Sequence, residues 1–117
     1  MIVQELYDKI TLANPCNQAD FITHFDTSVR ALIARYGTRY VVLPGAVYQR
    51  PSGLYDESPV FDEYMNAIYD NVLFLLTGNP DRKTDYVAEA DDAYKTVWKR
   101  LMRGKHFRDS DYKLYTW

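Results

Sequence analysis

The sequence has a single cysteine, Cys16, and this excludes an intramolecular disulfide. One free thiol fits a reducing compartment such as the cytoplasm. The most apolar run, residues 72–76, is five residues long, whereas a helix that crosses a bilayer needs about 20. The first ten residues lack the basic start and long apolar run of a signal peptide. We therefore expect a protein made in the cytoplasm with no membrane partner.

The sequence also lacks any recognisable reaction motif. Its glycines are isolated turn residues and do not form a phosphate-binding loop. Cys16 precedes a predicted helix start, but His24 lies two turns further on, about 11 Å away, which is too far for a nucleophile and its base. Asp85, Glu89 and Asp92 share a helix face that could hold a divalent cation, yet no Glu-x-x-His pair accompanies them. We expect no enzyme activity, no catalytic or metal-binding residue and no cofactor.

The apolar residues that are present recur with a helical period. Val3, Leu6 and Ile10 predict a helix over residues 3–13, ended by Asn14-Pro15. A second amphipathic stripe predicts a helix that begins between residues 17 and 20 and ends at Tyr36, before Gly37. The length of 117 residues and the 47% apolar content fit one globular domain, with a helical core over residues 1–104 and a C-terminal tail over residues 105–117.

A long helical hairpin is predicted over residues 58–103. Ser58-Pro59 provides a helix cap and a favourable first helical residue, and Gly78-Asn79-Pro80 provides the turn. Together with the two earlier helices, this hairpin predicts an all-α fold, a small four-helix bundle.

The segment between the second and third predicted helices has no helical period. Residues 39–43 are extended in character, Pro44-Gly45 is a turn signal, and residues 46–48 allow a return strand, so the segment is irregular or a β-hairpin. A connection of about twenty residues in so small a domain is usually functional. We expect this segment and the aromatic tail to contact partner proteins, through Tyr40, Val42, Val47, Tyr48, Tyr112, Tyr115 and Trp117.

Charge is sorted along the hairpin. Residues 54–92 contain ten acids and two bases, and residues 95–108 contain six bases and no acid. Within the last helix, Asp91 and Lys95 have the spacing of an ion pair. The second half of the preceding helix is apolar nearly all round, which is typical of a helix covered on every side. We therefore predict a subunit interface that comprises Asp85, Glu89, Asp92, Lys95, Trp98, Lys99, Arg103, Leu73 and Phe74.

The order of these helices resembles the small head-to-tail connector proteins, or adaptor and head-completion proteins, of tailed bacteriophages. The resemblance is carried by the short first helix, the second helix ending at Tyr36-Gly37, the long irregular segment, and the stretches PVFDEY (59–64) and LTGNP (76–80). It implies a structural virion protein of the neck. Such a protein forms a homo-oligomeric ring, commonly a dodecamer, between the portal and a tail or stopper protein. DNA passes through the lumen of the ring without sequence-specific binding.

A second interpretation is a small helical protein that binds nucleic acid or regulates another protein. The basic run of residues 95–108, interleaved with Trp98 and Phe107, could bind phosphates. The net charge of −2 gives no overall attraction for nucleic acid, and the equally long acidic stretch favours a protein partner.

Overall fold

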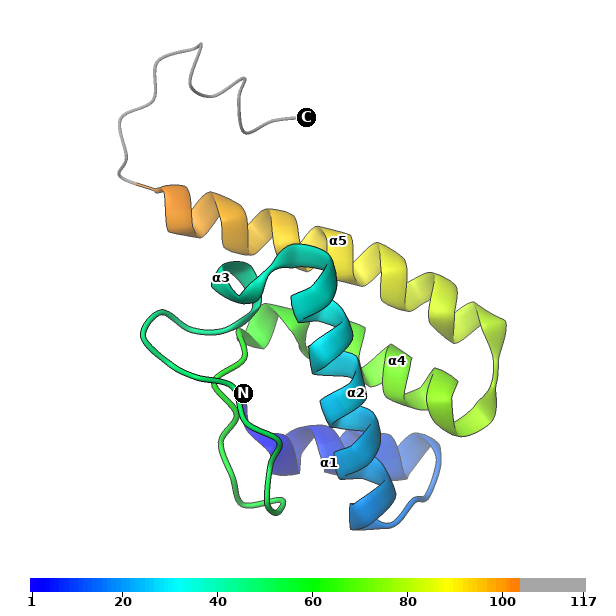
Figure 1. Ribbon diagram of the computed structural model, residues 1–117. Helices are drawn as coiled ribbons and strands as arrows, with labels where there is room; N and C mark the ends of the chain where they lie inside the picture. Colours follow the sequence, from blue (N-terminus) through cyan, green and yellow to red (C-terminus); the bar gives the residue numbers. More distant parts are fainter. Residues whose placement is uncertain (104–117) are drawn as a thin grey trace.

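Five α-helices and one short 3-10 helix make up the computed structural model over residues 1–103, the part of the chain that the structure describes (Figure 1). The all-α class is confirmed, since this part contains no β-strand and only two isolated β-bridges. In chain order the elements are α1 (Val3–Ala13), α2 (Gln18–Tyr36), α3 (Thr38–Val41), η1 (Asp62–Tyr64), α4 (Met65–Thr77) and α5 (Pro80–Met102).

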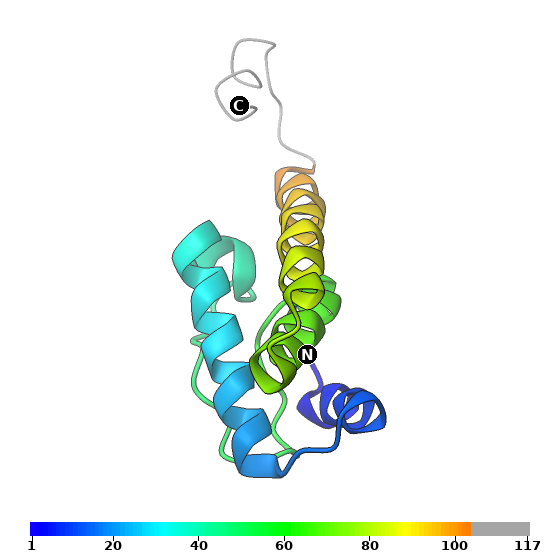
Figure 2. The same cartoon turned by 90° about the vertical axis from the view of Figure 1, so that its right-hand side faces the viewer.

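The helices form two layers. α4 and α5 run antiparallel and make the most extensive packing contact in the molecule. α2 crosses in front of α4, and α1 lies at the base of the molecule (Figure 1). Figure 2 shows α2 and α3 on one side and the α4–α5 hairpin on the other. The hairpin therefore turns one side toward α2 and leaves much of α5 uncovered.

The ends of the long helices follow the predicted signals. The Asn17 side chain accepts a hydrogen bond from the Asp20 backbone N–H (2.8 Å) and caps α2. Gly37 ends α2 with a φ of 91° and Gly78 ends α4 with a φ of 71°, conformations that a residue without Cβ adopts readily. The Asn79 side chain then caps α5 by accepting from the Asp81 N–H (3.0 Å). α1, α2 and the hairpin turn match their predicted positions.

Of the two alternatives predicted for the segment between the second and third helices, the irregular course is confirmed and a β-hairpin of residues 39–43 and 46–48 is wrong. Residues 38–41 form the short helix α3, and the chain then continues without a strand to η1. The predicted helix start at Ser58 is also wrong, because regular α-helix begins only at Met65. The reason is visible in the backbone: Ser58 N–H donates to the Met1 carbonyl (2.8 Å) and Phe61 N–H donates to the Val41 carbonyl (3.0 Å). These bonds to distant segments hold residues 57–61 extended.

The core lies where α1, α2 and the hairpin meet. Its largest fully buried side chains are Tyr64, Phe21 and Phe25, and each contributes roughly 1.5–3 kcal/mol through burial. Two polar side chains are buried with them: Asn71 of α4 donates to the Ser28 hydroxyl of α2 (2.7 Å), and Ser28 donates to the His24 carbonyl (2.7 Å). This chain of hydrogen bonds joins the two layers inside the core.

Candidate functional site

The outer face of α5 carries a line of exposed residues, all charged except Ala88, which we call the α5 stripe. Its members follow one another at spacings of three or four residues, so they lie on one side of the helix. The acidic members come first and the basic members last, over a length of roughly 33 Å. The stripe consists of Asp81, Asp85, Ala88, Asp92, Lys95, Lys99 and Arg103, all exposed.

Glu89, which the sequence places with this acidic group, faces the hairpin interior instead. Its carboxyl is hydrogen-bonded to that of Asp70 on α4, and Asp70 is only 4% exposed. Arg82 of α5 donates to Asp70 at 3.0 Å. Burial, followed by the hydrogen bond and charge of Asp70 and the charge of Asp85, raises the pKa of Glu89 to about 7, although Arg82 acts in the opposite direction.

The basic end of α5 is partly engaged within the chain. Arg100 makes a two-pronged ion pair with Glu63 of η1, at 2.9 and 2.6 Å, and its guanidinium lies over the Phe61 ring, 5.0 Å from the centroid. Within residues 1–103, Lys99 and Arg103 make no ion pair and stay exposed. At this end of α5, Lys99 and Arg103 therefore stay available to a partner.

The apolar residues of the predicted interface occupy different environments. Leu73 is 2% exposed and belongs to the core. Phe74 is half-buried, with the Lys83 ammonium 5.4 Å from its ring centroid. Trp98 is half-buried on α5, and Leu75 is exposed at the end of α4. Phe74 and Leu75 of α4 and Trp98 of α5 thus each keep part of their apolar surface accessible.

The predicted partner-contact residues of the connecting segment also differ from one another. Val42 is buried and forms a bridge with Val60. The Tyr40 ring packs edge-on against Tyr94, and the Tyr48 hydroxyl donates to the Asp26 carboxylate (2.8 Å). Val47 is the exposed member, with 78% of its surface accessible. Tyr112, Tyr115 and Trp117 lie outside the described residues.

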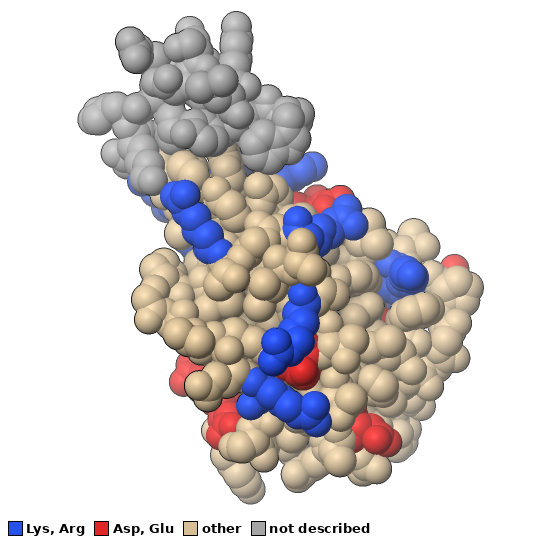
Figure 3. Space-filling model, viewed as in Figure 1, with Lys and Arg blue, Asp and Glu red and all other residues tan. Residues whose placement is uncertain are grey.

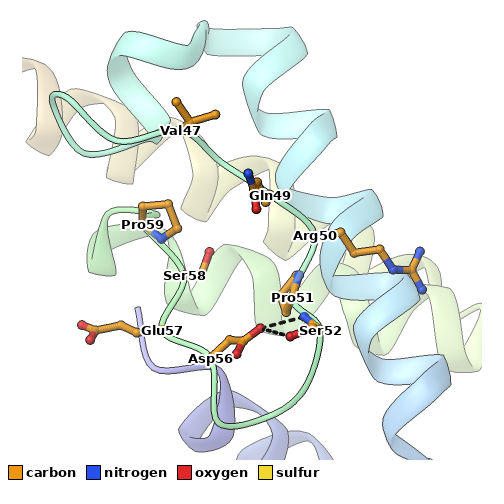
Figure 4. A pocket seen from close by; sticks show the side chains of 9 residues that line it. All are labelled: Val47, Gln49, Arg50, Pro51, Ser52, Asp56, Glu57, Ser58 and Pro59. Carbon is orange, nitrogen blue, oxygen red and sulfur yellow. Dashed lines mark hydrogen bonds between the residues drawn. The ribbon is translucent and has the colours of Figure 1, made fainter.

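The same connecting segment encloses a hollow of about 320 Å³ (Figure 4). The Asp56 carboxylate accepts from the backbone N–H (2.7 Å) and hydroxyl (2.8 Å) of Ser52, and these bonds lower its pKa. Ser58 is 3% exposed, and its hydroxyl has no hydrogen-bond partner. Glu57 points away from the hollow in Figure 4. The Asp56 carboxylate, one of the charged groups that line the hollow, is therefore already hydrogen-bonded to Ser52.

A tyrosine cluster between α2 and α5 was not predicted from the sequence. The Tyr36 ring stacks on Tyr94 with a centroid distance of 4.7 Å, and its hydroxyl donates to the Asp91 carboxylate. Arg35 approaches the same carboxylate at 3.4 Å. Burial first, and then Asp91, raise the pKa of Tyr36. Because the partners are 55 residues apart along the chain, no local pattern could have revealed this cluster.

Basic side chains are prominent on the face that carries α2. Figure 3 shows Lys and Arg in a broken line down the middle of this face, with Asp and Glu mainly near its edges. Arg30 of α2 is paired with Asp26 through both carboxylate oxygens, at 3.1 Å each. Arg35 of the same helix is paired with Asp91, so these two cations of α2 are neutralised within the chain.

The thiol of Cys16 and the acidic residues of α5 are the groups that the sequence offered for catalysis or metal binding. Burial, followed by the charge of Asp20, raises the pKa of the Cys16 thiol, which is the opposite of activation. No group of three or more His, Cys, Asp and Glu residues in this range is placed to hold a metal ion. None of its helices has the length and apolar character needed to cross a membrane. Comparisons with models of protein families, with curated proteins and with solved structures found no match to this chain.

Proposed function

We propose that this protein is a structural subunit of a virion, forming an oligomeric ring that connects the portal and head to the tail. The observation that carries the proposal is the α5 stripe, whose acidic first half and basic second half are both exposed. A ring repeats one heterologous interface, in which one surface of a subunit meets a different surface of the next. A stripe with opposite charges at its two ends provides two such complementary surfaces.

The order of charges within the stripe supports a role beyond solvation. Asp81 and Asp85 are four residues apart, as are Lys95 and Lys99, so like charges adjoin each other along the helix. Such pairs destabilise a helix by about 0.2–0.5 kcal/mol each. The helix dipole favours charges only in the first and last turns, whereas Asp92 and Lys95 lie near the middle of α5. A neighbouring subunit of opposite charge would offset this cost.

Ion pairs alone would not hold the ring together. An exposed pair contributes about 0–1 kcal/mol, while association of two proteins costs at least about 4 kcal/mol in lost translational and rotational freedom. The stripe would therefore orient the subunits, and apolar contact would supply the larger part of the affinity. Phe74, Leu75 and Trp98 are the residues beside α5 that we assign to this contact.

The proposed ring lies in the neck of the virion and, like the connectors that the sequence resembles, is a dodecamer. Its other partners would be the portal protein and a tail or stopper protein, with DNA crossing the lumen without sequence-specific contacts. The exposed Val47 on the connecting segment suits contact with one of these proteins.

Charge reversal tests the proposed interface. Lys99→Glu/Arg103→Glu makes both ends of the stripe acidic, and Asp81→Lys/Asp85→Lys makes both ends basic. Each double variant alone should remain monomeric at concentrations at which the wild-type protein assembles, as measured by light scattering. An equimolar mixture should assemble again, because every interface then joins opposite charges. Assembly of each double variant to the wild-type extent would refute the interface.

A nucleic-acid-binding function is the second candidate, favoured by the exposed cations Lys95, Lys99 and Arg103. Binding through phosphates should weaken steeply as salt increases. A gel-shift titration with duplex DNA at low and moderate salt distinguishes the two candidates. A salt-sensitive shift that Lys99→Glu/Arg103→Glu abolishes, in a protein that stays monomeric, would favour this second function over the ring.

A further inference from the structure

Two carboxyl groups meet between α4 and α5 and share one guanidinium. Asp70 of α4 is buried and accepts a hydrogen bond from Arg82 Nη1 at 3.0 Å. The Glu89 carboxyl is also hydrogen-bonded to Asp70. Two ionised carboxylates are acceptors only, so a hydrogen bond between them requires one proton.

One oxygen of the Glu89 carboxyl, Oε2, is buried and has no hydrogen-bond donor among residues 1–103. A buried carboxylate oxygen without a donor carries a large desolvation penalty, which protonation removes.

The charged groups that act on Glu89 come from the two helices of the hairpin. α4 provides Asp70, and α5 provides Asp85 and Arg82. Two carboxylates thus oppose one guanidinium around Glu89, and Arg82 is already engaged with Asp70. Burial and these two acids together raise the pKa of Glu89 to about 7, against the single lowering influence of Arg82.

We propose that Asp70 and Glu89 share a single proton across the α4–α5 contact, and that loss of this proton loosens the hairpin. In the protonated pair, the Glu89 carboxyl donates to one side of the Asp70 carboxylate while Arg82 donates to it as well. When the proton leaves, two carboxylates face each other, and Glu89 Oε2 becomes part of a buried anion without a donor. The contact between α4 and α5 is then a pH-sensitive clasp within the helical hairpin.

The direction of the pH effect follows from proton linkage. The folded chain holds a proton on Glu89 at pH values where the unfolded chain, with an ordinary value of 4.5, has released it. Folding stability therefore falls as the pH rises from about 4.5 to about 7, and the loss is complete above that range. An acid whose pKa is lowered by folding would instead make the folding stability rise with pH over its titration range.

Two measurements on the full chain test the clasp. Carboxyl ¹³C NMR should show Glu89 titrating near pH 7 in the wild-type protein and at a lower pH in Asp70→Asn. Thermal unfolding should show little difference between Glu89→Gln and wild type at pH 5. At pH 8 the variant should melt higher by about 4 °C or more, because its amide donates to Asp70 as the protonated acid does. Glu5→Gln, the same kind of change at an exposed position of α1 outside the proposed interface, should show no such pH-dependent difference.

Either of two results overturns the proposal: titration of Glu89 at its ordinary value of 4.5, or a melting difference between Glu89→Gln and wild type that stays constant from pH 5 to pH 8. The melting comparison does not depend on Asp70→Asn, so the test stands even where that variant fails to fold.

Discussion

The Tyr36 hydroxyl donates a hydrogen bond to the Asp91 carboxylate and so ties the last residue of α2 to the middle of α5. The Tyr94 ring stacks on Tyr36, and Arg35 approaches the same carboxylate. This contact is one of the few polar links between the α2 layer and α5. Because Asp91 adjoins Asp92 of the α5 stripe, the contact helps to hold that part of α5 in position.

Tyr36→Phe should destabilise the fold by about 1–2 kcal/mol, since the ring stays in place while a hydrogen bond to a charged group is lost. Urea unfolding followed by circular dichroism measures the change. Tyr55→Phe is the matched control, because Tyr55 is 97% exposed, and it should leave stability unchanged. Equal stability of the two variants would show that the Tyr36 hydroxyl contributes nothing.

The buried pair Ser28 and Asn71 should behave as a coupled unit. Ser28→Ala leaves the Asn71 amide without the acceptor that it uses at 2.7 Å, and we expect a loss of about 1–3 kcal/mol. Asn71→Leu removes the amide as well, so the double variant should be less destabilised than the sum of the two single variants, by about 1 kcal/mol. Strictly additive losses in a urea double-mutant cycle would contradict the coupling.

Gly78 allows a comparison between two glycines. Its φ of 71° is unfavourable for a side chain, whereas Gly53 has no positive φ and open space around it. Gly78→Ala should therefore destabilise by about 1–2 kcal/mol, and Gly53→Ala should change stability little. Thermal unfolding of the two variants measures the difference. A smaller loss for Gly78→Ala than for Gly53→Ala would refute the assigned role of the turn.

The helices could be predicted where local signals agree with each other. The apolar period and the stop at Asn14-Pro15 located α1, and Gly37 and Gly78 marked two further helix ends. Each of these signals acts within a few residues of the element that it defines. For that reason, contacts with distant parts of the chain did not shift the ends of these helices.

The prediction failed where distant contacts decide the structure. Val42 and Val60 form a bridge across eighteen positions, and this bridge holds extended a segment that the Ser58-Pro59 signal assigned to a helix. The spacing of Asp91 and Lys95 predicted an ion pair, but Asp91 contacts Arg35 and Tyr36 instead. No pattern along the chain distinguished these outcomes.

The candidate site was predictable in its charge but not in its geometry. The sequence placed Glu89 with Asp85 and Asp92 because all three share a helix face. Only the packing of α4 separates Glu89 from the other two, through its contact with Asp70. The sorting of acids and bases along α5 could be read directly, since all members of the stripe belong to one helix except Arg103, the residue that follows its end.

Asp85→Lys distinguishes an interface from a merely solvated helix face, because it should move stability and assembly in opposite directions. In the monomer it replaces the repulsion between Asp81 and Asp85 with a favourable pair and places a cation near Glu89, which should stabilise the fold by about 0.5 kcal/mol. In the assembly it places a base where the next subunit presents bases.

Urea unfolding of dilute protein and light scattering of concentrated protein measure the two effects of Asp85→Lys separately. Asp8→Lys, the same charge change on an exposed residue of α1, is the control and should leave assembly unchanged. A solvated stripe would allow Asp85→Lys to assemble as the wild-type protein does. If a more stable monomer assembles less well, lost folding cannot be the cause, and the stripe itself must contact the neighbouring subunit.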